Sequence, residues 1–512
     1  MNKYFWFIII LLIFSSCNEE SEKPEKWVEN LLLAEKDILI AISLDLNTLL
    51  SKSDLANSDQ ITNQNKMLIN AFNSSFKSSL LGFNVDIPQK MFLVSKENDS
   101  NGAIFWVGEL TNKFIFEQTV KNFFDVDDFS TSDVNTYYLK EYNLYLSFNE
   151  FNFVMGFSTD KKYVESKLKS YFNNDHYPEN NAAFLSFLEN TDDIGFYFSN
   201  KRINQLQNSL SKSTLRSLLN NSSVVNQIDH FGDELFTSLN FLNGKVSMNT
   251  TTYRSNNSIY NSNGVASLFK NFVSINELVS FGFANFDLNN EKYFFSNIIV
   301  LDKKEDFIAF NLLNDEKSRS TLNGEMSFAI AAIANNQTND PNFNKSSENF
   351  WEDDFDKTII ESDITPPFLV SLGVKEPYLL ENQIKEMNKK FELGNTVLMK
   401  DYYILLKDDF LHISNNEQLL KDIYRKNKKN YSHFNNQLFQ KPMYAEIDLE
   451  SGLNFMQLKN LKLLENNIFK KITFTADNNN FSILVNVKNK NQNSLKSISD
   501  LILKSQLLES YL

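Results

Sequence analysis

Cysteine, histidine, glycine and proline are all scarce in this chain of 512 residues, and their scarcity excludes several classes of protein. One cysteine rules out a disulfide framework or a thiolate zinc site within one chain. The four histidines never form an HExxH arrangement, so the helical zinc-protease motif is missing. With only 13 glycines, the chain contains neither GxGxxG nor GxxxxGK[ST], the loops that hold nucleotide phosphates. The sequence therefore predicts no cofactor and no metal site.

Positive charge is also in deficit. Lys and Arg number 50 against 64 Asp and Glu, which gives a net charge of −14. Proteins that bind nucleic acid need clustered Lys and Arg to neutralise phosphates. We therefore expect no nucleic-acid partner. Phe, in contrast, is abundant at 47 residues, and aromatic residues favour strands and buried faces.

The first residues carry the features of an export signal. Lys3 is followed by an unbroken apolar run over residues 4–14 and then by Ser15, Ser16 and Cys17. The run is shorter than the roughly 20 apolar residues that cross a bilayer. The stretch 14–17 resembles a bacterial lipobox, which predicts a signal peptide over residues 1–16 and lipidation of Cys17, giving a membrane-anchored protein. The alternative is an ordinary signal peptide with an incidental cysteine.

An acidic tether, residues 17–36, follows the cleavage site. Glu19, Glu20 and Glu22 directly after Cys17 resemble the export signal of surface lipoproteins in Bacteroidetes-type bacteria. The resemblance implies a lipid anchor in the outer membrane with the protein displayed at the cell surface. The alternative is a solvated linker that carries no sorting signal. In that case the protein could equally face the periplasm.

Two stretches of the chain match two later ones without gaps. Residues 104–123 align with 368–387, and residues 135–142 align with 395–402. In the first pair, apolar residues alternate as in a half-buried strand and then recur at i, i+4 and i+7 as along one helix face. The order strand, helix, strand, strand, helix is thus predicted twice, which indicates an internal duplication.

These patterns predict an α+β fold with internally duplicated antiparallel β-sheets covered by amphipathic helices. We place a first half at residues 37–274 and a second half at residues 275–512. An insertion rich in Asn, Asp and Glu lies at residues 335–364 of the second half. The alternative is two β-rich domains that share ancestry but no common core.

Candidate functional residues are few. GxSxG is absent, and the Ser/Lys pairs at SxxK spacing are of the kind that chance supplies, so we predict no catalytic residue. His412, in a predicted strand, is interpreted as an edge or turn residue. Trp351 stands in the polar insertion beside Asp353 and Asp354, where an exposed indole could contact a protein or a glycan.

The start of the predicted mature body resembles a known family. Residues 37–46 with 49–53 resemble its opening strand and Leu-rich helix, and residues 81–85, 102–105 and 322–326 resemble further motifs. The family comprises uncharacterised lipoproteins of about this length from Bacteroidetes-type bacteria, with a domain of unknown function. The resemblance implies a lipoprotein with a repeated α+β fold and implies no activity.

Three functional hypotheses follow. The first is a non-enzymatic, lipid-anchored envelope protein that binds a protein or glycan with its sheet surfaces and loops. The second is a carrier or assembly factor for an apolar envelope molecule, which the excess of Phe would permit. The third is a hydrolase of surface glycans or peptides, which rests only on the supply of carboxylates.

Overall fold

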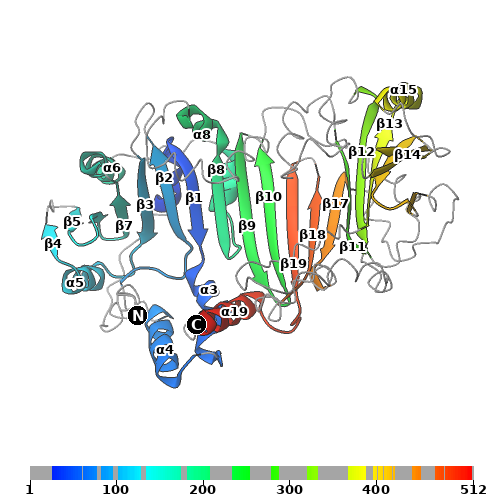
Figure 1. Ribbon diagram of the computed structural model, residues 1–512. Coiled ribbons are helices and arrows are strands. Elements are labelled where there is room, and N and C mark those ends of the chain that lie inside the picture. The colour runs from blue at the N-terminus through cyan, green and yellow to red at the C-terminus, as the bar shows by residue number, and fades with distance from the viewer. Residues whose placement is uncertain are drawn as a thin grey trace, which may run out of the picture. The chain divides into compact units, whose positions relative to one another are not determined.

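The chain forms two compact units, which we call unit 1 (Met1–Asn256 with Val487–Leu512) and unit 2 (Asn257–Asn486). The computed structural model is shown in Figure 1. It describes residues 26–59, 61–77, 82–95, 102–128, 134–158, 160–173, 181–207, 233–253, 278–286, 320–331, 367–387, 396–399, 402–407, 409–417, 419–420, 441–450, 468–477 and 479–509.

Unit 1 combines one antiparallel sheet with helices. Its described elements, in chain order, are α2 (Trp27–Ala34), β1 (Ile38–Leu44), α3 (Leu46–Ser53), the 3-10 turn η1 (Leu55–Asn57), α4 (Asn63–Lys77), β2 (Gln89–Ser95), β3 (Gly102–Glu109), α5 (Lys113–Phe123), β4 (Val126–Asp128), β5 (Asn135–Leu139), β6 (Leu144–Phe148), β7 (Asn152–Phe157), α6 (Lys161–Asn173), α7 (Ala182–Leu188), β8 (Ile194–Ser199), α8 (Asn200–Gln207), β9 (Glu234–Leu242), β10 (Lys245–Tyr253) and α19 (Ser494–Glu509).

The strands of unit 1 lie in the order β4-β5-β6-β7-β3-β2-β1-β8-β9-β10, and each neighbouring pair is antiparallel. Several helices begin at a side chain that accepts from a free backbone N–H of the first turn. Asp45 caps α3, Asn112 caps α5 and Asn181 caps α7 in this way. The turn residues of the sequence thus set where the helices start against the sheet.

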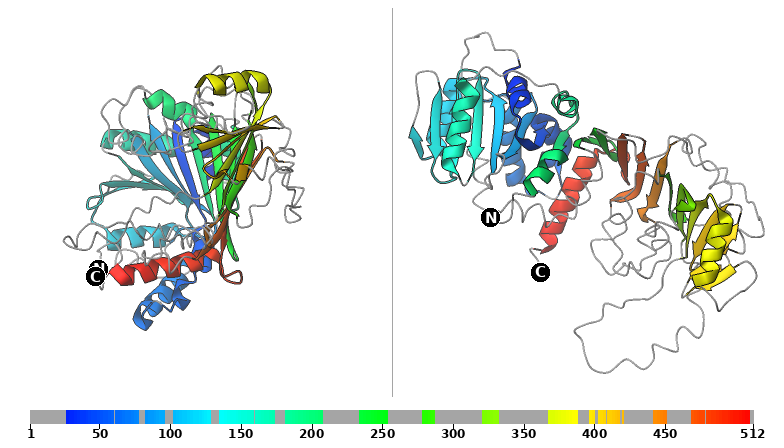
Figure 2. Two further views of the ribbon diagram at one scale, coloured as in Figure 1. Left: turned by 45° about the vertical axis from the view of Figure 1, so that its right-hand side comes forward. Right: turned by 90° about the horizontal axis from the view of Figure 1, so that it is seen from above.

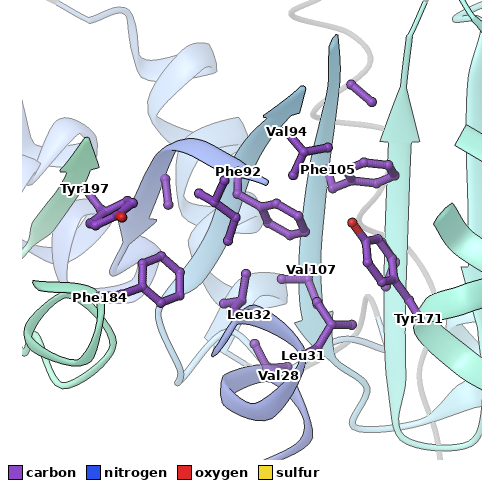
Figure 3. Close-up of a cluster of buried hydrophobic side chains, with 14 of the residues drawn as sticks. Val28, Leu31, Leu32, Phe92, Val94, Phe105, Val107, Tyr171, Phe184 and Tyr197 are labelled. Atoms are coloured by element: carbon purple, nitrogen blue, oxygen red, sulfur yellow. The ribbon is translucent and has the colours of Figure 1, made fainter. Parts of the chain in front are cut away.

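One face of the sheet in unit 1 packs against α2, α6 and α7. Figure 3 shows Leu31 and Leu32 of α2, Phe92 of β2, Phe105 of β3 and Tyr171 of α6 converging in this core. The rings of Phe92 and Phe105 stack with centroids 5.5 Å apart, and Tyr171 meets Phe105 edge-on at 5.3 Å. The abundant Phe therefore supplies much of the core, as the composition predicted.

The opposite face is covered by α5 at the β5–β7 end, and Trp106 of β3 packs against the edge of the same cluster. Phe116 and Val120 of α5 pack there with Phe148 of β6 and Phe153 of β7. The rings of Phe116 and Phe153 lie 5.3 Å apart. Strands β3, β2, β1 and β8 continue the sheet beyond this cluster.

Unit 2 is also an antiparallel sheet. Its described elements are β11 (Leu278–Asn285), β12 (Leu322–Ala331), β13 (Phe368–Val374), α15 (Pro377–Met387), β14 (Thr396–Met399), β15 (Tyr402–Lys407), β16 (Phe410–Ser414), β17 (Met443–Asp448), β18 (Phe469–Ala476) and β19 (Asn480–Val487). The strand order is β14-β15-β16-β13-β12-β11-β17-β18, again antiparallel throughout.

The two units share an order of elements. Strands β5, β6, β7, β3, β2, β1, β8 and β9 correspond in order to β14, β15, β16, β13, β12, β11, β17 and β18. Helices α5 and α15 begin and end at positions that the gapless alignment equates, since both ends differ by 264 residues (377 − 113 and 387 − 123). Antiparallel sheets combined with helices, the coarse part of the predicted fold, are confirmed.

The C-terminal segment belongs to unit 1, whereas the sequence placed everything after residue 274 in one half. Val487 N donates to Gly244 O at 2.8 Å, and Gly244 N donates to Gln492 O at 2.9 Å. Helix α19 then packs against α3, as Figures 1 and 2 show in red and blue. Lys496 of α19 pairs with Asp54, and Ser58 Oγ donates to Asp500 at 2.6 Å. These contacts join segments that lie more than 200 residues apart in the chain, so local sequence patterns could not predict them.

Candidate functional site

The predicted contact and lipidation residues lie outside the described residues. This holds for Cys17, Trp351, Asp353 and Asp354, and also for most of the acidic insertion. Within the described residues, no group of His, Cys, Asp or Glu could hold a metal ion. No helix among these residues combines the length and the apolar character needed to traverse a bilayer.

The most unusual described surface is part of the sheet in unit 1. Along β1, β2, β3, β7 and β8, alternate residues point either into the core or away from it, because side chains alternate across a strand. Ala41, Phe92 and Tyr197 are among those in the core. Their neighbours along each strand point to the other face and remain half-exposed or exposed. We call these ten residues the apolar face: Ile40, Ile42, Met91, Leu93, Ile104, Trp106, Met155, Phe157, Phe196 and Phe198.

Strand register arranges the apolar face in two rows. One row crosses five strands with Phe157, Ile104, Leu93, Ile40 and Phe198 as successive partners. The second row is formed in the same way by the partners Met155, Trp106, Met91, Ile42 and Phe196. Partners on one face of adjacent strands lie close enough for their side chains to touch. The ten side chains therefore make one continuous apolar surface.

Exposure is greatest at the β3–β7 end of this surface. Ile104 is 50% exposed and its cross-strand partner Phe157 is 42% exposed. Scattered exposed apolar residues are ordinary, but a contiguous apolar patch marks a binding surface. The adjoining rings of Phe196 and Phe198 stack with centroids 6.5 Å apart at the other end.

Polar groups on the apolar face are already satisfied. Its one nitrogen, Nε1 of Trp106, donates to Gln89 Oε1 at 3.3 Å. Gln89 is itself buried, and its amide donates to the backbone oxygens of Asn84 at 2.7 Å and Ile87 at 3.1 Å. The face therefore offers dispersion and hydrophobic contact to a ligand and offers no free hydrogen-bonding group of its own.

One network of charged groups in unit 1 lies among the helices on the other side of the sheet. The buried carboxylate of Glu35 accepts from Lys167 Nζ at 2.8 Å and from Tyr171 OH at 2.7 Å. Burial, with the nearby Glu35 charge, raises the pKa of the Tyr171 hydroxyl well above its usual value. This network holds α6 against the end of α2, which is a structural role.

His412 is not an edge or turn residue, contrary to the sequence interpretation. It lies within β16 and is buried, and its Nδ1 is 2.7 Å from Ser371 Oγ of β13. Ser371 is 1% exposed, and its partner on the other side is Ser327 of β12, which is fully buried. Although a Ser–His pair suits nucleophilic catalysis, substrate cannot reach a hydroxyl buried to this degree. All five residues of β16 are buried, so both faces of this strand are covered, and the local sequence could not show that His412 meets Ser371 of β13.

Comparison with known proteins adds little. No family model matches the chain, and no curated protein matches it. Among solved structures, crystal form I of TP0453 is similar at 12% identity and a TM-score of 0.25, over 46% of this chain and 80% of that one. Crystal form IV gives 14% and 0.27 over 44% and 83%, and crystal form III gives 10% and 0.23 over 79% and 99%. Likenesses at this level carry no argument about fold or function.

Proposed function

We propose that this protein is a non-enzymatic, lipid-anchored protein of the cell envelope that binds an apolar ligand on the apolar face of unit 1. The observation that carries the proposal is the continuous surface of ten apolar side chains, exposed most at Ile104 and Phe157. Cys17 is the proposed anchor in the outer membrane. Of the functions considered from sequence, the carrier of an apolar envelope molecule is the one this surface favours.

The ligand class follows from the chemistry of the surface. None of the ten side chains is charged, and the Trp106 indole N–H is already engaged. A protein or glycan partner needs acceptors and donors for its own polar groups, and burying them unpaired costs about 1–3 kcal/mol each. An acyl chain brings no such groups, and each methylene removed from water contributes about 0.8 kcal/mol. We therefore assign the acyl chain of a lipid as the occupant.

We also propose that the two units are copies of one ancestral α+β unit whose helices are amphipathic covers. The shared strand order and the equal bounds of α5 and α15 support this. The register equates Ile40, Ile42 and Leu44 of β1 with Ser280, Gly282 and Ala284 of β11, because the partner strands β8 and β17 meet them at matching positions.

Unit 2 differs from unit 1 at one equivalent place on this face. A methyl group added at Gly282 would lie 2.6 Å from Cε1 of Phe328, so that ring lies over the glycine. Where unit 1 has Ile42 beside Met91, unit 2 has Gly282 beside Phe328. The difference supports lipid binding by unit 1 alone.

Fluorescence titration tests the proposed function. The mature protein with Cys17→Ser, which carries no acyl anchor, would be titrated with a dansylated C11 fatty acid. We expect saturable enhancement of dansyl emission. The double variant Ile104→Glu with Phe157→Glu should lose it, because two charges would lie within the binding surface.

The matched control is Tyr378→Glu, which alters a side chain that is 72% exposed on α15 of unit 2. This variant should bind as the parent does. Equal binding by the parent and the double variant, with both folded by circular dichroism, would remove the apolar face as the site. If emission is unchanged for every protein while a surface partner still binds, the protein- or glycan-binding alternative gains instead.

A further inference from the structure

Helices α3, α4 and α19 form a layer of their own in unit 1, which we call the end layer. Figure 1 shows the three helices grouped below the strands, where α3 contacts both α4 and α19. Among the described side chains of these helices, only three are buried, and all three are serines: Ser53, Ser494 and Ser497. A surface helix normally buries its apolar residues and exposes its polar ones. In the described part of the end layer, this burial is reversed.

Helix α19 is held to unit 1 by polar residues. Lys496 pairs with Asp54, and Asp500 accepts from Ser58 Oγ at 2.6 Å. Lys496 and Asp500 lie four residues apart, so they share one face of the helix. Apolar residues recur at i, i+3 and i+7 along a different face, as Leu495, Ile498 and Ile502. The apolar side of α19 is therefore not the side that attaches this helix to α3 and η1.

Helix α4 has even less cover. Its Met67 is 73% exposed, compared with 50% for Ile502 of α19. The helix has 15 residues, and a helix of that length is marginal in water unless an apolar face is packed. None of the described side chains of α4 is buried, so unit 1 supplies little of that packing. Contact with a second apolar phase would supply the rest.

The proposed lipid anchor keeps one such phase close to unit 1. Cys17 lies ten residues before Trp27, where α2 begins, and ten residues span at most about 36 Å. A domain of the size of unit 1 has a radius of gyration of about 19 Å. The anchored unit 1 therefore stays within about its own diameter of the bilayer.

Charge favours the same partner. The chain carries a net charge of −14, so most of it is repelled by an anionic lipid surface. Residues 60–85, which include all of α4, contain two lysines and no acidic residue. Lysines together with apolar residues on one helix are typical of helices that lie in the headgroup region of a membrane. Helix α4 thus combines exposed apolar surface with a local positive charge.

We propose that the end layer is a membrane-contact surface, in which α4 and α19 lie against the headgroup region of the bilayer and Met67 and Ile502 enter its apolar part. The contact orients unit 1, while the acyl chains on Cys17 supply the anchoring. The proposal rests on the anchor in the function proposed above. It does not rest on lipid binding at the apolar face.

The single cysteine of the chain allows a site-specific test. In the mature protein with Cys17→Ser, Met67→Cys or Ile502→Cys would carry an NBD fluorophore and be titrated with vesicles of equal parts phosphatidylglycerol and phosphatidylcholine. We expect both labels to brighten and shift to the blue, because NBD emission reports an apolar environment. Tyr378→Cys, at a position 72% exposed on α15 of unit 2, is the matched control and should not respond.

The other outcomes overturn the proposal. Equal responses from all three labels, or no response from Met67→Cys and Ile502→Cys, would exclude the end layer as the contact. A response of these two labels to rising protein concentration without vesicles would assign the surface to a second copy of the chain. Adding Ile104→Glu with Phe157→Glu should leave the response to vesicles unchanged, and its loss would place the contact at the apolar face instead.

Cosedimentation with the same vesicles gives a second measurement. Met67→Glu with Ile502→Glu should lower the partition of the Cys17→Ser protein onto the vesicles by at least about tenfold, because two apolar contacts are replaced by charges that the lipid surface repels. Tyr378→Glu should partition as the parent does, and circular dichroism checks that all three proteins are folded. Equal partition of the three contradicts the proposal.

Discussion

Among the described residues, buried charged groups differ in how they are held. Asp193, at the start of β8, is nearly fully buried. Both its oxygens accept from Lys52 Nζ at 2.7 Å, and Oδ2 also accepts from the Phe241 N–H at 2.7 Å. We expect Asp193→Ala to lower the free energy of unfolding by about 3–5 kcal/mol, since it removes the charged partner of Lys52, which keeps only Asn240 Oδ1 at 2.9 Å, and leaves the buried Phe241 N–H without its acceptor. Urea denaturation measures this.

A surface ion pair provides the comparison. Asp127 and Lys140 lie 2.9 Å apart, but both side chains are over 40% exposed. Asp127→Ala should change the free energy of unfolding by less than about 1 kcal/mol. If Asp127→Ala lowers the free energy of unfolding as much as Asp193→Ala does, burial does not explain the contribution of Asp193 to stability.

Lys90 of β2 leads to the opposite expectation. The residue is 5% exposed, and burial lowers the pKa of its amine more than the charge of Glu29 raises it. An apolar side chain of similar length avoids that desolvation, so Lys90→Met should raise the free energy of unfolding by about 1 kcal/mol at pH 7. The control Lys245→Met, at an exposed position on β10, should be near neutral. Paired urea titrations of the two variants and the parent check this.

The advantage of Lys90→Met should depend on pH. Because the pKa of Lys90 is lower in the folded chain than its ordinary value of 10.5, the unfolded chain binds more protons between the two values. The stability of the parent therefore rises through that window, and the advantage of Lys90→Met shrinks as pH approaches 10.5. A constant advantage from pH 7 to 10.5 would mean that Lys90 is not a buried cation.

At the scale of elements, the start of α5 lies against the backbone of Gly82. Gly82 has φ of +78°, and its carbonyl accepts from the N–H groups of Thr111 and Asn112 at 2.9 and 3.1 Å. A Cβ at this position would lie 2.7 Å from Asn112 O. Gly82→Ala should lower the free energy of unfolding by about 2 kcal/mol or more, through a disfavoured φ and a backbone clash.

Gly195→Ala is the matched control for this substitution. A Cβ there would meet the Asn190 side-chain amide at 2.9 Å, and that side chain is able to move. Its cost should be below about 1 kcal/mol. Thermal unfolding of both variants tests the difference. Equal losses of stability would show that position 82, at the start of α5, does not require glycine.

Much of the element pattern could be predicted from sequence. The apolar spacing of residues 104–123 and 368–387 predicted a strand and then a helix, and β3 with α5 and β13 with α15 occupy those places. Periodicity of this kind depends only on neighbouring residues, so it can be recognised without knowledge of the fold. Residues 38–46 were likewise predicted as a strand, and β1 occupies residues 38–44.

The apolar face could not be predicted in the same way. Ile42 and Met91 meet only because β1 and β2 are neighbours in the sheet, and β3 then adds Trp106. Alternation says that a strand has two faces, but it cannot say which face a helix covers. In β1, both faces carry apolar residues, so the pattern alone reads as an ordinary core strand.

For the whole molecule, the proposed anchor determines where the ligand is met. Cys17→Ser in the full chain should move the protein from the membrane fraction to the soluble fraction, because the acyl chains supply the membrane affinity. Fractionation with immunoblotting measures this. Membrane retention of Cys17→Ser would point to a different attachment.

The orientation of the anchored protein has its own test. Protease added to intact cells, with lysed cells as the control, should digest a surface-displayed protein, which is the location that the acidic tether predicts. Protection until lysis would place the protein on the periplasmic side, in keeping with a carrier that acts between the membranes.

The most direct test of the account is to ask what the protein carries. The parent and the Ile104→Glu, Phe157→Glu double variant, both also Cys17→Ser, would be purified from their host without detergent, extracted with organic solvent and analysed by lipid mass spectrometry. The account predicts acyl lipid near one molecule per chain in the parent and at least about tenfold less in the double variant, since two buried charges cost more than 1.4 kcal/mol. A parent that carries no lipid, or a double variant that carries as much as the parent, would contradict lipid binding at the apolar face.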